Sequence, residues 1–137
     1  MNTLIVFDSK HGAVEECVRL MESKLSGPVT THKFGSPEPV PDLDAYDSVV
    51  MGGSIHAGSL QKSVREFCEK ELPRLREKRL GLFICSMTPP EKAFGYFSQF
   101  PGGLAESAVV KECFGGAVRF ETMNFFEAFL LKRIMKC

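Results

Sequence analysis

Near its start the chain reads Leu4-Ile5-Val6-Phe7-Asp8-Ser9-Lys10-His11-Gly12-Ala13-Val14, and this stretch decides the fold. The four residues from Leu4 to Phe7 are all apolar, which is typical of a strand buried on both faces of a parallel sheet. After Gly12 the apolar residues change to helical spacing, and one helix face carries Val14, Cys17, Val18, Met21 and Leu25. A buried strand, a short turn and an amphipathic helix predict the first unit of an α/β fold.

The alternation of strand and helix continues along the chain. Apolar or alternating runs predict further strands at residues 29–34, 48–51, 80–85 and 108–114. No hairpin signal separates these strands, so we expect them to be parallel, with helices on both faces of the sheet. The length of 137 residues suits one domain, which we expect to span 1–137.

The remaining segments predict the helices that cover the sheet. Helical spacing over 64–75 predicts a helix that Pro73 bends or interrupts. Beyond a loop at 86–90, the residues expected in the core are Phe94, Phe97 and Leu104. Asn124 and Glu127 resemble a capping box, which predicts a last helix with apolar residues Phe125, Phe126, Phe129, Leu130 and Ile134.

The charge balance argues against a nucleic-acid partner. The chain has 17 basic and 17 acidic side chains, so it lacks the basic surface that phosphate-rich partners need. Its first residues form only a short apolar run without a basic segment before it, which predicts neither a signal peptide nor a membrane span. We therefore expect a cytoplasmic protein.

The five cysteines form neither a Cys-x-x-Cys pair nor a zinc-ligand cluster in the sequence. Four of them lie in apolar periodic segments, where a thiol behaves as a small hydrophobic group. We predict that Cys17, Cys68, Cys85 and Cys113 are shielded and unpaired, as suits a reducing compartment, and that Cys137 is reactive.

Ligands of parallel α/β sheets bind outside the carboxyl ends of the strands, so the loops after the strands are the candidate site. The first loop runs from Asp8 to Val14 and opens a helix, whose free N–H groups suit a phosphate. Its sequence is neither a dinucleotide-binding fingerprint nor a nucleotide-hydrolase P-loop. The alternative is a tight turn that Ser9 merely caps. The candidate phosphate-binding residues are Ser9, Lys10, His11, Gly12, Ala13 and Val14.

Two further loops could complete the site. The second, from Gly52 to Leu60, is rich in small residues and would let backbone approach a flat ligand. His56 could stack on a ring or donate a proton, or be an ordinary surface histidine. The third loop has polar or adaptable side chains that could close over the same ligand. The candidate residues of these loops are Ser54, Ile55, His56, Ala57, Gly58, Ser86, Met87 and Thr88.

Three stretches carry a family resemblance. Leu4 to Gly12 resembles the first strand and phosphate loop of flavodoxins, and Ala45 to Gly58 is similar to the second ligand loop of one flavodoxin branch. That branch contains the flavodoxin-type, menaquinone-dependent protoporphyrinogen dehydrogenases. The late segments Gly115–Ala117, Met123–Phe126 and Lys132–Met135 resemble the same branch.

This resemblance implies a flavodoxin-like three-layer sandwich with a five-stranded parallel sheet in the order 2-1-3-4-5. It also implies noncovalent FMN and electron transfer with a redox partner protein or a quinone. Flavodoxin phosphate loops usually carry further hydroxyl groups where this chain has His11, Ala13 and Val14. Relatives in the branch continue for another helix-sized stretch beyond the position of Cys137.

Several functions remain open from the sequence. The leading one is FMN-dependent electron transfer, in which no residue acts as a nucleophile, acid or base. The alternatives are a quinone-linked protoporphyrinogen dehydrogenase and a flavin-free, degenerate domain; a phospho-receiver is disfavoured because Asp8 lacks a second acid and an acceptor aspartate is missing. The apolar and basic residues of 124–137 predict either a core-covering helix or weak association with anionic lipid at the inner face of the membrane.

Overall fold

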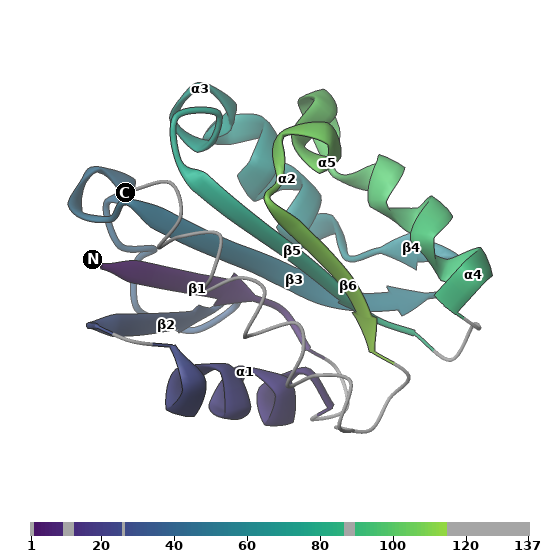
Figure 1. Ribbon diagram of the computed structural model, residues 1–137, viewed down its shortest axis with the longest axis horizontal. Helices are drawn as coiled ribbons and strands as arrows, with labels where there is room; N and C mark the ends of the chain where they lie inside the picture. The colour runs from purple at the N-terminus through teal and green to yellow at the C-terminus, as the bar shows by residue number, and fades with distance from the viewer. Residues whose placement is uncertain (1, 10–12, 26, 87–89, 115–137) are drawn as a thin grey trace.

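The computed structural model describes residues 2–9, 13–25, 27–86 and 90–114, which form a parallel sheet between two layers of helices (Figure 1). The sheet order is β2-β1-β3-β5-β6, with a short strand β4 paired to β3. The strands are β1 (Thr3–Phe7), β2 (Val29–Lys33), β3 (Ser48–His56), β4 (Ser59–Leu60), β5 (Arg79–Cys85) and β6 (Val110–Phe114). Apart from β4, the strands are parallel and follow the predicted order, which confirms the fold class.

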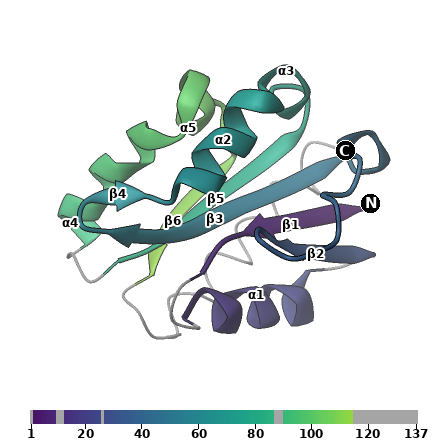
Figure 2. The same ribbon diagram turned by 180° about the vertical axis from the view of Figure 1, so that it is seen from behind.

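Helices cover both faces of the sheet. Helix α1 (Ala13–Lys24) lies on one face, and the other helices of the described residues lie on the opposite face, as the two opposite views show (Figures 1 and 2). The latter are η1 (Leu43–Ala45), α2 (Lys62–Lys70), α3 (Leu72–Leu75), α4 (Pro90–Ala93), η2 (Phe94–Gln99), η3 (Pro101–Gly103) and α5 (Leu104–Ser107). The expected helix over 64–75 is divided into α2 and α3 next to Pro73, because proline lacks the N–H that a continuous helix needs.

The core has two halves, one on each face. All five residues of β1 are buried, and alternate residues contact different halves: Ile5 and Phe7 face α1, whereas Leu4 and Val6 face α2. The five predicted apolar positions of α1 are buried, namely Val14, Cys17, Val18, Met21 and Leu25. Full burial of a side chain of this size contributes roughly 1.5–3 kcal/mol, so this stripe fixes α1 on the sheet.

The segment from Gly52 to Leu60 differs from its prediction as a loop. Strand β3 continues through Ser54, Ile55 and His56, and then folds back as an antiparallel hairpin with β4. The small residues that indicated a loop serve packing instead: a Cβ at Gly52 would lie 2.3 Å from the ring of Phe83. The expectation of a chain without hairpins was therefore wrong at this position.

The expectation for Phe94 was also wrong. Phe94 is 45% exposed, while Phe97, Phe100 and Leu104 are buried. These three lie in the half of the core that contains Leu4 and Val6, which we call the α2-side core. The rings of Phe97 and Phe100 stack with their centroids 6.0 Å apart. Phe94 lies where α4 gives way to the 3-10 helix η2, so the regular helical spacing that would have turned it inward is lost.

The cysteine prediction is confirmed for the part of the chain that is described. Cys17, Cys68, Cys85 and Cys113 are free thiols and all four are buried. Cys137 lies outside the described residues, as does the segment 124–137 for which a last helix was predicted.

Candidate functional site

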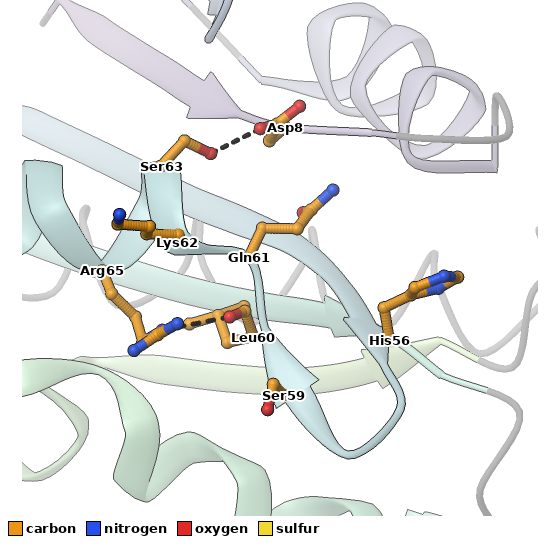
Figure 3. A pocket seen from close by; sticks show the side chains of 8 residues that line it. All are labelled: Asp8, His56, Ser59, Leu60, Gln61, Lys62, Ser63 and Arg65. Atoms are coloured by element: carbon orange, nitrogen blue, oxygen red, sulfur yellow. Dashed lines mark hydrogen bonds between the residues drawn. The ribbon is translucent and has the colours of Figure 1, made fainter.

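A cavity of about 420 Å³ opens at the carboxyl edge of the sheet (Figure 3). The end of β1, the β3–β4 hairpin and the start of α2 surround it. Its lining residues are Asp8, His56, Ser59, Leu60, Gln61, Lys62, Ser63 and Arg65. The fold thus brings the ends of the first and second predicted ligand segments to one place, as expected for parallel strands whose carboxyl ends share an edge.

Asp8 fixes one wall of this cavity. One carboxylate oxygen accepts a hydrogen bond from the Ser9 backbone N–H at 2.7 Å, and the other accepts one from the Ser63 hydroxyl. Since Ser63 is in the first turn of α2, Asp8 connects the end of β1 to the start of that helix. Neither residue was among the predicted site residues, although an acid directly after a buried strand is a signal that could have suggested Asp8.

The hairpin that forms the opposite wall turns in two residues. Ile55 pairs with Leu60 and His56 with Ser59, which leaves Ala57 and Gly58 at the turn. Both turn residues have positive φ, 51° at Ala57 and 80° at Gly58, as two-residue hairpin turns with matching twist require. A Cβ at Gly58 would meet no atom within 4 Å, so the tip of the hairpin is open on that side.

Three side chains hold the hairpin backbone in place. Gln61 accepts a hydrogen bond from the Ser54 N–H at 2.9 Å. Gln99 accepts one from the Leu60 N–H at 2.7 Å and donates one to the Gly58 carbonyl at 2.9 Å. The Arg65 Nε donates to the Leu60 carbonyl at 3.1 Å. The sequence carries no local signal for these contacts, because their partners meet only after folding.

We expect Gln99→Ala to destabilise the protein by roughly 1–3 kcal/mol, because the Leu60 N–H loses its partner in a buried position. The Leu60 amide should also exchange hydrogen faster. Urea unfolding and amide exchange of the variant measure both effects. Ser98→Ala is the matched control, since the exposed Ser98 hydroxyl donates a hydrogen bond to the carbonyl of Gly95 within the same turn and not to the hairpin. An unchanged Leu60 exchange rate would contradict the assigned role of Gln99.

The first predicted segment is described only at its two ends. Ser9 lies after β1, Ala13 begins α1, and Lys10, His11 and Gly12 lie outside the described residues. The Val14 side chain is fully buried against the sheet, so only its backbone can face a ligand. Glu15, in the first turn of α1, forms an ion pair with Lys33 at 2.7 Å.

The ion pair between Glu15 and Lys33 shifts the pKa of both side chains. Burial by itself would raise the pKa of Glu15, but hydrogen bonds from Lys33, Ser9 and the backbone outweigh it and leave the pKa below its usual value. The hydrogen bond to Glu15 in turn raises the pKa of Lys33. Lys33 therefore compensates one of the two carboxylates that lie in the first turn of α1.

This arrangement gives a pH dependence with a defined sign. A carboxyl whose pKa is lowered by folding stabilises the protein above its unfolded-state pKa, and that contribution is lost as pH falls through the lowered value. Wild type should therefore exceed Glu15→Gln in stability near pH 7, and the difference should shrink below about pH 4. Urea titrations of both proteins from pH 7 to about pH 3 measure this difference in stability. A difference that grows in acid would contradict the lowered pKa of Glu15.

The third predicted segment adjoins the second. Ser54 pairs with Cys85 across β3 and β5, and Ser86 follows Cys85 in a buried position. Met87 and Thr88 lie outside the described residues. The fold therefore brings Ser54 and Ser86 to adjacent strand ends, while Ile55 to Gly58 extend beyond them in the hairpin.

Two other kinds of site are absent from the described part of the chain. No group of three or more His, Cys, Asp or Glu residues is placed to hold a metal ion there. Among the helices within those same residues, none is long and apolar enough to cross a membrane.

The sheet order and the cavity at its carboxyl edge define a flavodoxin-like α/β protein. A family model described as a flavodoxin domain matches residues 4–137, so the chain belongs to the flavodoxin domain family. Protoporphyrinogen IX dehydrogenase [quinone] of Escherichia coli K12 is 24% identical over 99% of this chain and 80% of its own length.

Solved flavodoxins have the same fold. The flavodoxin of Streptococcus pneumoniae TIGR4 superposes with a TM-score of 0.70 at 17% identity, covering 100% of both chains. That of Megasphaera elsdenii gives 0.66 at 17% identity, covering 94% of this chain and 98% of its own. These structures confirm the predicted fold. Membership of the flavodoxin domain family supports the predicted class, an FMN-binding redox protein that carries out electron transfer.

Proposed function

We propose that FMN binds at the carboxyl edge of the sheet, with its phosphate at the start of α1 and its ring beside the β3–β4 hairpin. The observation that carries the proposal is the cavity that β1, the hairpin and α2 form at this edge, in a chain of the flavodoxin domain family. The residues of the proposed site are those predicted from the sequence, together with Asp8 and Gln99, which support them.

The start of α1 fits a phosphate through its backbone. A helix of 12 residues presents free N–H groups and the positive end of its dipole there. The Ser9 hydroxyl is engaged by Glu15, and the buried Val14 offers no hydroxyl. Phosphate affinity would therefore rest on backbone N–H groups and on Lys10, with Lys33 reducing the repulsion from Glu15.

The hairpin fits a flat ring. Its tip is open at Gly58, and Ala57 adds only a methyl group, so a planar ligand can approach the backbone closely. The contacts of Gln61, Arg65 and Gln99 hold that backbone before a ligand arrives, which reduces the ordering cost of binding. His56, at the end of β3, would stack on the ring or donate a proton to it.

FMN supplies the electron-transfer chemistry when it is bound, and the protein groups orient it and set its potentials. Here the backbone groups between Ser54 and Gly58 that Gln61, Gln99 and the pairing with β4 leave available would hydrogen-bond the polar edge of the ring. Ser86 would limit solvent access from the neighbouring strand. No side chain needs to act as a nucleophile.

Titration with flavin tests this proposal. Adding purified protein to FMN should quench flavin fluorescence saturably, and FAD should bind no better, because a terminal phosphate fits a helix start more readily than a bridging pyrophosphate. The control is riboflavin, which lacks the phosphate and should bind more weakly. Protein at micromolar concentration that neither quenches FMN nor copurifies with flavin would show a degenerate, flavin-free domain.

A quinone-linked protoporphyrinogen dehydrogenase is the second candidate. It is favoured by the similarity to the E. coli enzyme over 99% of this chain. Anaerobic reduction of the protein followed by addition of a menaquinone analogue distinguishes the two functions. Rapid reoxidation by the quinone, with oxidation of protoporphyrinogen, would identify the enzyme; reoxidation by a protein partner alone would identify an electron carrier.

Peripheral binding to the inner face of the membrane belongs to this second candidate. The basis is the sequence of 124–137, where Lys132, Arg133 and Lys136 follow a strongly apolar run. Sedimentation with anionic and neutral vesicles at low and high salt tests it. Equal recovery in the supernatant under all four conditions would leave an electron carrier without a membrane partner.

A further inference from the structure

Two buried thiols from distant parts of the chain lie in contact. The Sγ atoms of Cys17 and Cys85 are 4.0 Å apart, although 68 residues separate them in the sequence. Cys17 is on α1 and Cys85 is the last residue of β5. Their side chains are 3% and 6% exposed and lie in the same apolar cluster.

We propose that Cys17 and Cys85 are an oxidation site that closes to an intramolecular disulfide and opens again on reduction. The two sulfurs already touch, and a bond of about 2.05 Å requires an approach of about 2 Å, by rotation of both side chains and a small shift of α1. Both residues lie toward the carboxyl edge of the sheet, one turn into α1 and at the end of β5. Because both thiols are buried, a small oxidant reaches them only when this packing opens locally. The proposal does not depend on where FMN binds.

The two thiols have different roles in this reaction. The contact with the Cys85 thiol lowers the pKa of Cys17, while the same contact and burial raise the pKa of Cys85. Cys17 is therefore the attacking sulfur, because the thiolate is the nucleophile. With hydrogen peroxide, the Cys17 thiolate attacks one oxygen and the O–O bond breaks, giving a sulfenic acid and hydroxide. The Cys85 sulfur then displaces water from that sulfenic acid, so that two thiols and one peroxide yield one disulfide and two waters.

The other two described cysteines are less suited to this reaction: Cys68 has a thioether neighbour, and Cys113, which is close enough to Cys85 to act on its pKa, has its own thiolate disfavoured by burial. Cys68 contacts the thioether sulfur of Met51 at 3.7 Å, which cannot form a disulfide, and burial raises the pKa of Cys68 to about 12. Burial also raises the pKa of Cys113 to about 12. Both thiols should therefore remain reduced under conditions that oxidise the Cys17–Cys85 pair.

The consequence of closure is a covalent link between α1 and β5. These elements carry the first and third candidate ligand segments at their ends, Ser9 to Val14 and Ser86 to Thr88. A disulfide here would fix the spacing of the two segments, so oxidised and reduced protein should differ in FMN affinity if the proposed site is right. Comparing the FMN affinity of oxidised and reduced protein tests whether the disulfide affects cofactor binding. Whether the disulfide forms is tested separately.

The experiment is a thiol map of the 137-residue chain before and after treatment with hydrogen peroxide or oxidised glutathione. We expect a mass loss of about 2 Da, reversal by dithiothreitol, and a crosslinked peptide pair containing Cys17 and Cys85. Cys17→Ser and Cys85→Ser should abolish the crosslink, whereas Cys68→Ser should retain it.

Several results would overturn the proposal. They are full alkylation of both thiols after oxidation, a disulfide that joins any other pair, or oxidation of Cys17 to sulfinic acid with Cys85 still reduced. The map of the unmodified chain decides the question even where a serine variant fails to fold. Blocking Cys137 by alkylation of the native protein before oxidation prevents links between molecules from entering the result.

Discussion

A single methyl group placed at position 52 should destabilise the protein by about 3 kcal/mol. In Gly52→Ala the new Cβ would lie 2.3 to 2.4 Å from three carbons of the Phe83 ring. The Phe83 side chain projects from β5 into the core that α1 covers and is fully buried there. Its ring therefore cannot move aside without disturbing its neighbours. The free energy of unfolding from urea titration measures the loss.

Two further variants isolate the cause. Gly95→Ala is the matched control, because a Cβ at Gly95 meets no atom within 4 Å and should change stability by less than about 0.5 kcal/mol. Combining Gly52→Ala with Phe83→Leu should cost less than the sum of the single changes, since the smaller side chain makes room for the methyl group. Strict additivity would rule out the collision between positions 52 and 83.

The second large effect is expected from Leu60→Ala, with a loss of about 3 kcal/mol. The Leu60 side chain is only 1% exposed and anchors β4 in the α2-side core, and its backbone bonds both Gln99 and Arg65. Truncation leaves a cavity beneath the hairpin, so FMN affinity should fall together with stability. Urea unfolding and flavin titration measure the two effects.

Ser59→Ala is the control for this variant, since Ser59 is the exposed neighbour on the same short strand. It should leave stability within about 0.5 kcal/mol of wild type. Should Leu60→Ala lose stability but bind FMN with unchanged affinity, the hairpin would be part of the core without being part of the cofactor site.

The sequence was most informative where burial follows a simple period. The run from Leu4 to Phe7 and the stripe on α1 each point to one arrangement, because a strand buried on both faces is uniformly apolar and a covering helix is apolar at every third or fourth residue. These two patterns were enough to predict the layers, the parallel strands and the edge of the sheet that carries the candidate site.

The hairpin shows where such reasoning fails. Small residues after Met51 indicated a loop, but Gly52 is small because Phe83 occupies the space that a side chain would need. A glycine imposed by a neighbour in space cannot be distinguished from a glycine in a turn by local sequence. The same holds for Gln99, whose two hydrogen bonds to the hairpin connect positions about 40 residues apart.

The central claim is that FMN binds at the carboxyl edge of this sheet, and an NMR titration of the ¹⁵N-labelled protein with FMN tests it most directly. We predict saturable shifts of the backbone amides of Ser9, Gly58 and Ser86, one from each candidate segment. Amides near Arg74, in α3 and distant from this edge, should remain unchanged. Shifts confined to the opposite edge, or no saturable shift at all, would contradict the account.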